Sequence, residues 1–411
     1  MGLADWEVDV YGDLDLARLR SYRLERFRAE LRGADVAGAL LYDPLNIRYA
    51  TDARNMQVWT LHAPGRYVFV ATEGPVILFD YHGCFHICAH LETLDEIRPA
   101  IAWLPFSVGA DYMARARAWA EEIADLVRVY GGGVRRLAVD RSEPAGLFCL
   151  SELGVEVCDG QWLIERARSV KSAEEVAAVK LSMAACDAAL RTMQDGMRAG
   201  MSENEVWSLM HGSYIASGGE WIETRFAASG PRTNPWFQEC SGRRMEAGEL
   251  FVFDSDMVGP TGYLADVSRA WLVGDGVASD EQRRLYGTAY EQVHFNLELV
   301  RSGLGFREFT EKSWRMPEEY RDNRYAVVAH GAGLCDEYPS IYYAEDMPGG
   351  RSEGVLEAGM VLCVESYIGE SGGLGTAKEG VKLEQQVLVT DDGYELLSPY
   401  PFEDRLLPRE V

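Results

Sequence analysis

The sequence predicts an α/β N-terminal domain followed by an α+β C-terminal domain. A length of 411 residues corresponds to two or three domains, at roughly 150 residues each. Helix and strand patterns alternate up to about residue 165, whereas the later part has several strands bracketed by long helices. We therefore expect domains at 1–165 and 166–411, each large enough for its own hydrophobic core.

Local signals justify each element of the first domain. Residues 17–33 have helical periodicity and end at Gly33, and residues 36–42 form a short apolar run typical of a buried strand. Two further apolar runs flank Glu73-Gly74-Pro75, which predicts a hairpin. The remaining expected elements are a helix near 112–130, a strand at 135–140, a helix near 145–152 and a strand at 155–159.

In the second domain, capping boxes mark where three helices begin. A serine is followed three residues later by Glu or Gln at Ser172, Ser202 and Ser279. Between the second and third of these helices, residues 249–274 predict two strands around a turn at Gly259–Gly262. Residues 325–389 are rich in strand patterns with Gly and Pro turns, which completes an α+β domain.

Charge and composition exclude several classes of protein. There are 40 Lys and Arg against 65 Asp and Glu, a net charge of −25, so no basic surface is available for nucleic acid. No apolar stretch is long enough to span a membrane, and the start of the sequence lacks a secretory signal. Eight scattered cysteines fit reduced thiols better than a disulfide framework. We expect a cytoplasmic protein without nucleic-acid or membrane partners.

The predicted hairpin at 250–272 contains three aspartates that can converge. Asp254 and Asp256 lie two apart on a strand and so share a face, and a turn centred on Pro260 would place Asp266 opposite Asp254. Two carboxylates about 4 Å apart repel by roughly 4 kcal/mol at an effective dielectric of 20, so the cluster requires cations or protons. On this segment alone, a solvated strand face paired with arginines is an equally good interpretation.

Three more candidate ligands occupy apolar runs further along the chain. His330 follows YAVVA, Glu365 lies in VLCVES and Glu384 lies in VKLEQQVLV. The three aspartates and two glutamates carry −5, which two divalent ions would nearly balance. Such an oxygen-rich set with one imidazole favours octahedral Mn, Fe or Co over tetrahedral zinc. Cys335 and Cys363 flank these ligands, and we expect both to be packing residues.

The candidate ligands occur in the order FDSD, AD, H, E, E, and the chain also contains the segments GYLADVSRAW and HGAG. This pattern resembles the creatinase/aminopeptidase or pita-bread family over roughly residues 166–400. This resemblance implies a pita-bread catalytic domain behind an α/β domain. It also implies a metal site of two Asp, one His and two Glu in this order. Members of the family are usually homodimers, so a homodimer is expected, with Trp59 of one subunit close to the site of the other.

Two departures from the peptidases of this family bear on function. Their histidine before the metal hairpin is replaced here by the segment Asn234-Pro235-Trp236-Phe237-Gln238. Their second histidine, shortly after the metal-binding one, is absent from the segment HGAGLCDE that begins at His330. Because both usual hydrogen-bond donors to a peptide substrate are missing, peptide hydrolysis is the weaker interpretation.

The replacements are similar to those of DddP-type dimethylsulfoniopropionate (DMSP) lyases, a branch of the same fold. By this resemblance, Asp256 is an additional metal ligand, Asp336 is the catalytic base, and Tyr325 contacts the substrate. The implied reaction is a metal-dependent β-elimination that cleaves DMSP, a small sulfonium carboxylate, to dimethyl sulfide and acrylate. Two divalent ions are expected, iron in the first place, with Mn, Co, Ni or Zn as alternatives.

Further expectations concern the surroundings of these residues. Aromatic faces bind sulfonium cations, and Trp59, Trp236 and Tyr338 are candidates beside Tyr325. We expect Leu334 and Cys335 to shield Asp336 from water. The Gly-rich interval ESGGLGTAKEG between Glu365 and Glu384 is a few residues longer than in the lyases.

Two alternatives to the lyase remain. One is a metallohydrolase of the same fold, acting on an Xaa-Pro peptide or on a C–N bond of a small osmolyte. The other is a non-catalytic binding protein.

Overall fold

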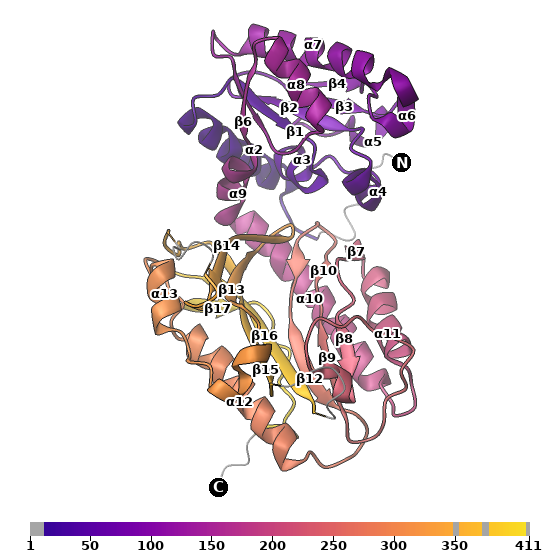
Figure 1. The fold of residues 1–411 in the computed structure, drawn as a ribbon, viewed down its shortest axis with the longest axis vertical. Coiled ribbons are helices and arrows are strands. Elements are labelled where there is room, and N and C mark those ends of the chain that lie inside the picture. Colours follow the sequence, from indigo (N-terminus) through magenta and orange to yellow (C-terminus); the bar gives the residue numbers. More distant parts are fainter. Residues whose placement is uncertain (1–11, 348–352, 372–377, 408–411) are drawn as a thin grey trace. The chain divides into compact units, whose positions relative to one another are not determined.

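The computed structural model describes residues 12–347, 353–371 and 378–407. The chain divides into two compact units, one formed by Asp15–Arg168 and the other by the described residues before Asp15 and from Ser169 onward. Figure 1 shows the first in indigo to magenta and the second in magenta to yellow. Among the described residues, no helix combines the length and apolar character that crossing a membrane would need.

A mixed six-stranded sheet forms the centre of the N-terminal unit, in the order β4-β3-β2-β1-β5-β6. The strands β1, β2 and β3 pair antiparallel, and the outer pairs are parallel. The strands are β1 (Gly38–Leu41), β2 (Tyr67–Ala71), β3 (Val76–Asp80), β4 (Glu96–Pro99), β5 (Arg136–Val139) and β6 (Glu156–Asp159). The helices are α2 (Leu16–Gly33), α3 (Pro44–Thr51), α4 (Gln57–His62), α5 (Phe85–Cys88), α6 (Pro105–Val108), α7 (Tyr112–Tyr130), α8 (Pro144–Glu152) and α9 (Gln161–Ser169), with a 3₁₀ turn at Gly109–Asp111.

The local signals in this unit correspond to real elements. The hairpin around Glu73-Gly74-Pro75 joins β2 to β3, which are buried along their whole length. Helix α7 buries Trp119 and Ile123 in the same hydrophobic cluster as residues of the sheet, so this unit has its own core. The predicted α/β class of the N-terminal domain is therefore confirmed.

Three antiparallel sheets form the C-terminal unit. Their orders are β11-β10-β7, β12-β9-β8 and β14-β13-β15-β16-β17. The strands are β7 (Trp221–Ile222), β8 (Ala227–Ser229), β9 (Leu250–Asp254), β10 (Met257–Val258), β11 (Leu264–Ala265), β12 (Ser268–Leu272), β13 (Val327–Ala332), β14 (Asp336–Tyr342), β15 (Val361–Gly369), β16 (Gly380–Val389) and β17 (Tyr394–Leu396).

Long helices pack against these sheets. All three expected capping boxes form, at the starts of α10, α11 and α12. Helix α12 packs against β15 and β16, while α10 contacts β10 and β11 (Figure 1). The helices are α10 (Ala173–Gly196), α11 (Glu203–Ala216), α12 (Asp280–Leu297) and α13 (Phe306–Lys312), with 3₁₀ turns at Gly230–Thr233 and Glu318–Asn323.

The hairpin that carries the three aspartates has a different register from the expected one. Asp254 pairs with Ser268 rather than with Asp266, so the prediction of a turn centred on Pro260 is wrong by one residue. The reason lies in the turn, where Gly262 adopts a φ of +82° and donates its N–H to the Gly259 carbonyl oxygen. In this register Asp266 lies level with Asp256. The expectation that Asp254 and Asp256 share one strand is also wrong, because Asp256 lies in the break between β9 and β10 with a φ of +37°.

A buried glutamate at the start of α11 ties three segments together. Glu203 accepts hydrogen bonds from the backbone N–H and hydroxyl of Ser229, both at 2.8 Å. It also accepts from the N–H and hydroxyl of Ser241, at 2.9 and 2.7 Å, and pairs with Arg232. A buried carboxylate is stable here because each oxygen has several donors.

We predict that Glu203→Ala lowers the free energy of unfolding by about 3 kcal/mol, because it leaves buried donors and Arg232 without their acceptor. Denaturant unfolding followed by tryptophan fluorescence measures this change. Glu205→Gln on the same helix is the matched control, since Gln preserves the capping box; it should cost less than about 0.5 kcal/mol. Equal losses in the two variants would show that the Glu203 network does not stabilise the unit.

Candidate metal centre

Six predicted ligands converge at one place in the C-terminal unit. Oxygens of the three hairpin aspartates lie within 4.8 Å of one another. The His330 Nε2 atom lies 3.0 Å from Glu365 Oε1 and 3.6 Å from both Asp266 Oδ2 and Glu384 Oε1. The residues brought together are Asp254, Asp256, Asp266, His330, Glu365 and Glu384.

The sheet register explains how residues distant in the sequence meet. Glu365 on β15 and Glu384 on β16 are directly paired, so their side chains leave the same face of the sheet. His330 lies on β13, the other neighbour of β15. Strand β16 also packs against β12 and β9, which brings the hairpin with its aspartates to this face.

Hydrogen bonds hold several of the carboxylates in place. The Ser268 hydroxyl bridges Asp254 Oδ1 and Glu384 Oε2, at 2.8 Å to each. The Thr224 hydroxyl donates to Asp256, and the backbone N–H of Asp266 donates to the Gln386 side chain at 2.9 Å. Ser268 and Thr224 thus orient the carboxylates of Asp254, Glu384 and Asp256, whereas Gln386 holds the backbone of Asp266.

Burial makes this cluster costly without a cation. Asp254, Asp266, His330, Glu365 and Glu384 are only 0–8% exposed. Burial, reinforced by neighbouring carboxylates, raises the pKa of Asp256 and Asp266 well above the ordinary range. Burial and Glu384 raise the pKa of Glu365 to about 7. These carboxylates therefore retain protons at neutral pH in the absence of metal.

In His330 and Glu384, neighbouring charges outweigh the effect of burial. Burial opposes the charge of His330, but Asp336 and Glu365 outweigh it and raise its pKa well above 6.5. Burial likewise opposes ionisation of Glu384, yet Lys382 and His330 hold its pKa well below the usual glutamate value.

Lys382 is a site residue that the sequence-based prediction missed. Its buried ammonium pairs with Glu365 and lies 3.3 Å from both Asp254 Oδ2 and Glu384 Oε2. It also donates to the Ser268 hydroxyl at 2.8 Å. A signal for it exists in the sequence, because Lys382 lies two residues before Glu384 in an apolar strand and so shares its face.

The charges and unsatisfied oxygens fit two divalent ions. The three aspartates and two glutamates sum to −5, Lys382 brings the total to −4, and two divalent ions would neutralise it. Among the described residues, no hydrogen bond reaches the buried Asp266 Oδ1 or Glu384 Oε1. Buried carboxylate oxygens without donors are expected where a cation binds. The donor set of oxygens and one imidazole is therefore suited to a divalent transition metal.

The candidate base lies at the exposed edge of this cluster. Asp336 is the first residue of β14, and its Oδ1 atom lies 3.5 Å from His330 Nδ1. Its side chain is 64% exposed, so the expectation that Leu334 and Cys335 would shield it from water is wrong. The reason is that Leu334 turns into the core, whereas Asp336 begins a strand and faces outward.

Tyr325 lies beside the cluster. The Lys382 ammonium lies 5.4 Å from the centre of its ring, and the Phe237 ring lies 5.4 Å away on centroid distance. Burial raises the pKa of the Tyr325 phenol far above its usual value, so the hydroxyl stays protonated.

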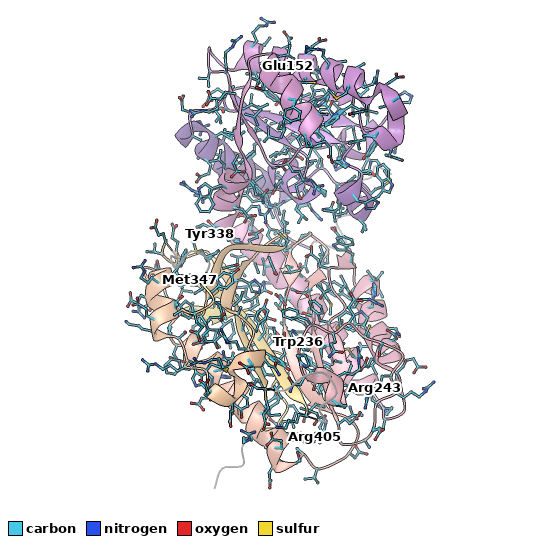
Figure 2. The ribbon with its side chains drawn as sticks, viewed as in Figure 1. Glu152, Trp236, Arg243, Tyr338, Met347 and Arg405 are labelled. Carbon is cyan, nitrogen blue, oxygen red and sulfur yellow. The ribbon has the colours of Figure 1, made fainter. Side chains whose placement is uncertain are left out.

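The other predicted substrate contacts have different surroundings. Trp236 lies in the C-terminal unit (Figure 2). It is buried in the core there and packs against Tyr367 and Phe226. Tyr338 is half-buried on β14, and its hydroxyl donates to the Glu353 carbonyl oxygen at 3.2 Å. Trp59 belongs to the N-terminal unit and is 37% exposed. Contact of these three residues with a substrate stays a prediction.

The structure describes only part of the interval between Glu365 and Glu384, which was expected to be longer than in the lyases. The strands β15 and β16 pair up to Gly369 and Gly380, so the ligands lie on regular strands on both sides of it. Residues 372–377 lie outside the described residues.

Comparison with known proteins finds relatives that match the chain over nearly its whole length. The chain is 37% identical over 414 residues to "Dimethylsulfoniopropionate lyase DddP" of Roseovarius nubinhibens, which covers 100% of this chain and 92% of that protein. A second DddP, from Roseobacter denitrificans, is also 37% identical and covers 99% of this chain and 91% of its own length.

Solved structures and a family profile agree on the fold. The Xaa-Pro dipeptidase from Bacillus anthracis superposes with a TM-score of 0.75 at 22% identity, covering 93% of this chain and 99% of that structure. The expected pita-bread fold is thereby confirmed. The sequence profile described as "Metallopeptidase family M24" matches residues 177–391, which include all six candidate ligands. The chain therefore belongs to metallopeptidase family M24.

Proposed function

We propose that this protein is a metal-dependent lyase that cleaves DMSP to dimethyl sulfide and acrylate. The observation that carries the proposal is the 37% identity, over the whole chain, to two proteins named as DMSP lyases. The geometry supports it, because an exposed carboxylate, Asp336, lies at the edge of a buried cation-binding cluster. An elimination also needs no attacking water, which agrees with the missing peptidase histidines.

The residues proposed to hold two divalent ions are those of the buried cluster. When bound, such ions would stabilise the negative charge that develops on a substrate carboxylate as its neighbouring carbon loses a proton. Lys382 would keep Glu365, Glu384 and Asp254 oriented, since its ammonium contacts all three. The ligand residues are Asp254, Asp256, Asp266, His330, Glu365 and Glu384.

In the proposed reaction Asp336 is the general base. Its carboxylate removes the proton from the carbon next to the substrate carboxylate, and that electron pair forms the carbon–carbon double bond. The bond from carbon to sulfur breaks, and its electrons leave with dimethyl sulfide. Its exposure lets Asp336 meet a substrate from the solvent side, and the protonated carboxyl can return its proton to water.

Aromatic rings near the cluster would recognise the sulfonium. The Tyr325 ring contacts the Phe237 ring, and Tyr325 already has the Lys382 ammonium over its ring. An onium group over an aromatic face gains about 0.5–2 kcal/mol. Trp59, Trp236 and Tyr338 remain further candidates for this contact.

A metallohydrolase is the second candidate function, and membership of family M24 favours it. Glu365 or Asp336 would then act as general base toward a water molecule. Release of a new amine from an Xaa-Pro dipeptide or a small C–N-bonded osmolyte would identify this activity. A non-catalytic binding protein is the third candidate, and it requires purified protein to lack stoichiometric metal.

Metal-loaded protein should release dimethyl sulfide from DMSP, because the cluster and Asp336 together meet the requirements of the elimination. Gas chromatography of the headspace detects the product, and acrylate should appear in equal amount in solution. Protein treated with a chelator is the control. Amine release from a dipeptide without any dimethyl sulfide would reject the lyase in favour of the hydrolase.

Asp336→Asn should lower kcat by about 10²–10⁴-fold, the usual contribution of a general base. Its metal content should stay unchanged, since Asp336 is not among the proposed ligands, whereas Asp266→Asn should lose metal. Asp391→Asn, at an exposed turn, is the matched control for removing one negative charge. Nearly normal turnover in Asp336→Asn would show that another group is the base.

Metal removal should make the stability of the protein depend on pH. Glu365, Asp256 and Asp266 have raised pKa values in the folded state, so between about pH 4.5 and 7 the unfolded chain releases protons that the folded chain keeps. The free energy of unfolding of the metal-free protein therefore falls as pH rises. His330 acts in the same direction above pH 6.5.

The melting temperature of loaded and chelator-treated protein, measured from pH 5.5 to 8, checks this. The difference between them should widen as pH rises, because bound cations remove the need for protons. A constant or shrinking difference would contradict the assignment of these carboxylates as the metal site.

A further inference from the structure

A buried cysteine lies among the candidate ligands. Cys363 on β15 is fully buried, two residues before Glu365 and therefore on the same face of the strand. In the sheet it is paired with His330 of β13 on one side and with Gln386 of β16 on the other. Its thiol is thus surrounded by residues of the cluster and not by an apolar core alone.

The distances suit coordination of one ion. The Cys363 Sγ atom, a ring nitrogen of His330 and carboxylate oxygens of Asp266 and Glu384 all lie within 4.8 Å of one another. Donors that bind one ion at about 2.0–2.3 Å can lie at most about 4.6 Å apart, so only a small adjustment is needed. Among the described residues, we find no hydrogen bond to the Cys363 thiol that would have to be broken.

We infer that Cys363 is a further ligand of the metal centre, donating sulfur to the ion shared with His330, Asp266 and Glu384. The inference rests on the proposed metal site and goes beyond its oxygen and nitrogen ligand set. On coordination, a bond from sulfur to the metal replaces the S–H bond, and the proton passes to solvent.

A sulfur donor changes which ions the site prefers. Thiolate binds softer ions such as Zn²⁺, Co²⁺ and Fe²⁺ better than Mn²⁺ or Mg²⁺, which prefer oxygen ligands. The position that Cys363 occupies would therefore bind a thiophilic ion, whereas the group formed by Asp254, Asp256 and Asp266 offers oxygen alone. The two ends of the cluster would differ in metal preference.

Absorption spectroscopy of cobalt-loaded protein tests the inference without an activity assay. The full-length, metal-free chain is titrated with Co²⁺, and bound cobalt is measured by elemental analysis. We expect a near-ultraviolet band from charge transfer between thiolate and cobalt, together with weak visible bands from bound Co²⁺. Cys363→Ser and Cys363→Ala should keep the visible bands and lose the ultraviolet band. Cys149→Ala, which removes a buried cysteine of the N-terminal unit, should retain both.

The wild-type spectrum alone can overturn the inference, so a poorly folded variant does not leave it undecided. Bound cobalt with visible bands but no charge-transfer band would show that Cys363 only packs. Persistence of the band in Cys363→Ala would assign the sulfur to another cysteine. Failure to bind cobalt at all would reject the metal site itself, and with it both proposals.

Metal competition provides a second readout. The preference for Zn²⁺ over Mn²⁺, measured as a ratio of dissociation constants, should fall at least about tenfold in Cys363→Ser. The same preference in the wild type and in Cys363→Ser would also overturn the inference.

Discussion

The candidate site depends on one constraint, which is that carboxylates removed from water must be neutralised. Two charges about 4 Å apart cost roughly 4 kcal/mol at an effective dielectric of 20, and this cluster contains five carboxylates. Lys382 supplies one compensating charge within the fold and contacts three of them. The remaining charge of −4 requires either bound protons or two divalent ions, so metal content and protonation are linked.

The scaffold meets this constraint with antiparallel strands. Adjacent strands place paired residues on one face, so β13, β15 and β16 supply His330, Cys363, Glu365, Lys382 and Glu384 from a single sheet. The aspartate hairpin contributes the other ligands from a second sheet that packs against β16. His330, Glu365 and Glu384 lie on regular strands and Asp254 ends β9, whereas Asp256 and Asp266 lie in the breaks between β9 and β10 and between β11 and β12.

The proposed function depends on the edge of the cluster rather than on its centre. The six candidate ligands lie within a match to family M24 and so agree equally with hydrolysis and elimination. By the proposal, the distinguishing residues are Asp336, exposed beside His330, and the segment around Trp236, where the resemblance implies a histidine in the peptidases. Since the protein carries a net charge of −25, its long-range field does not attract a carboxylate, and a sulfonium carboxylate has no net charge to be steered, so binding must come from the site itself.

The sequence by itself determined the α/β and α+β halves of the chain, the helix starts at Ser172, Ser202 and Ser279, and the acidic residues that cluster, because these follow from local periodicity and spacing. Only the tertiary structure decided that Asp254 faces Ser268, since the backbone geometry of the turn sets the register. It also placed Lys382 among the carboxylates and left Asp336 exposed. Alternation along β16 indicates that Lys382 shares a face with Glu384, but its contacts with Asp254 and Glu365 join strands far apart in the sequence, and no local pattern encodes them.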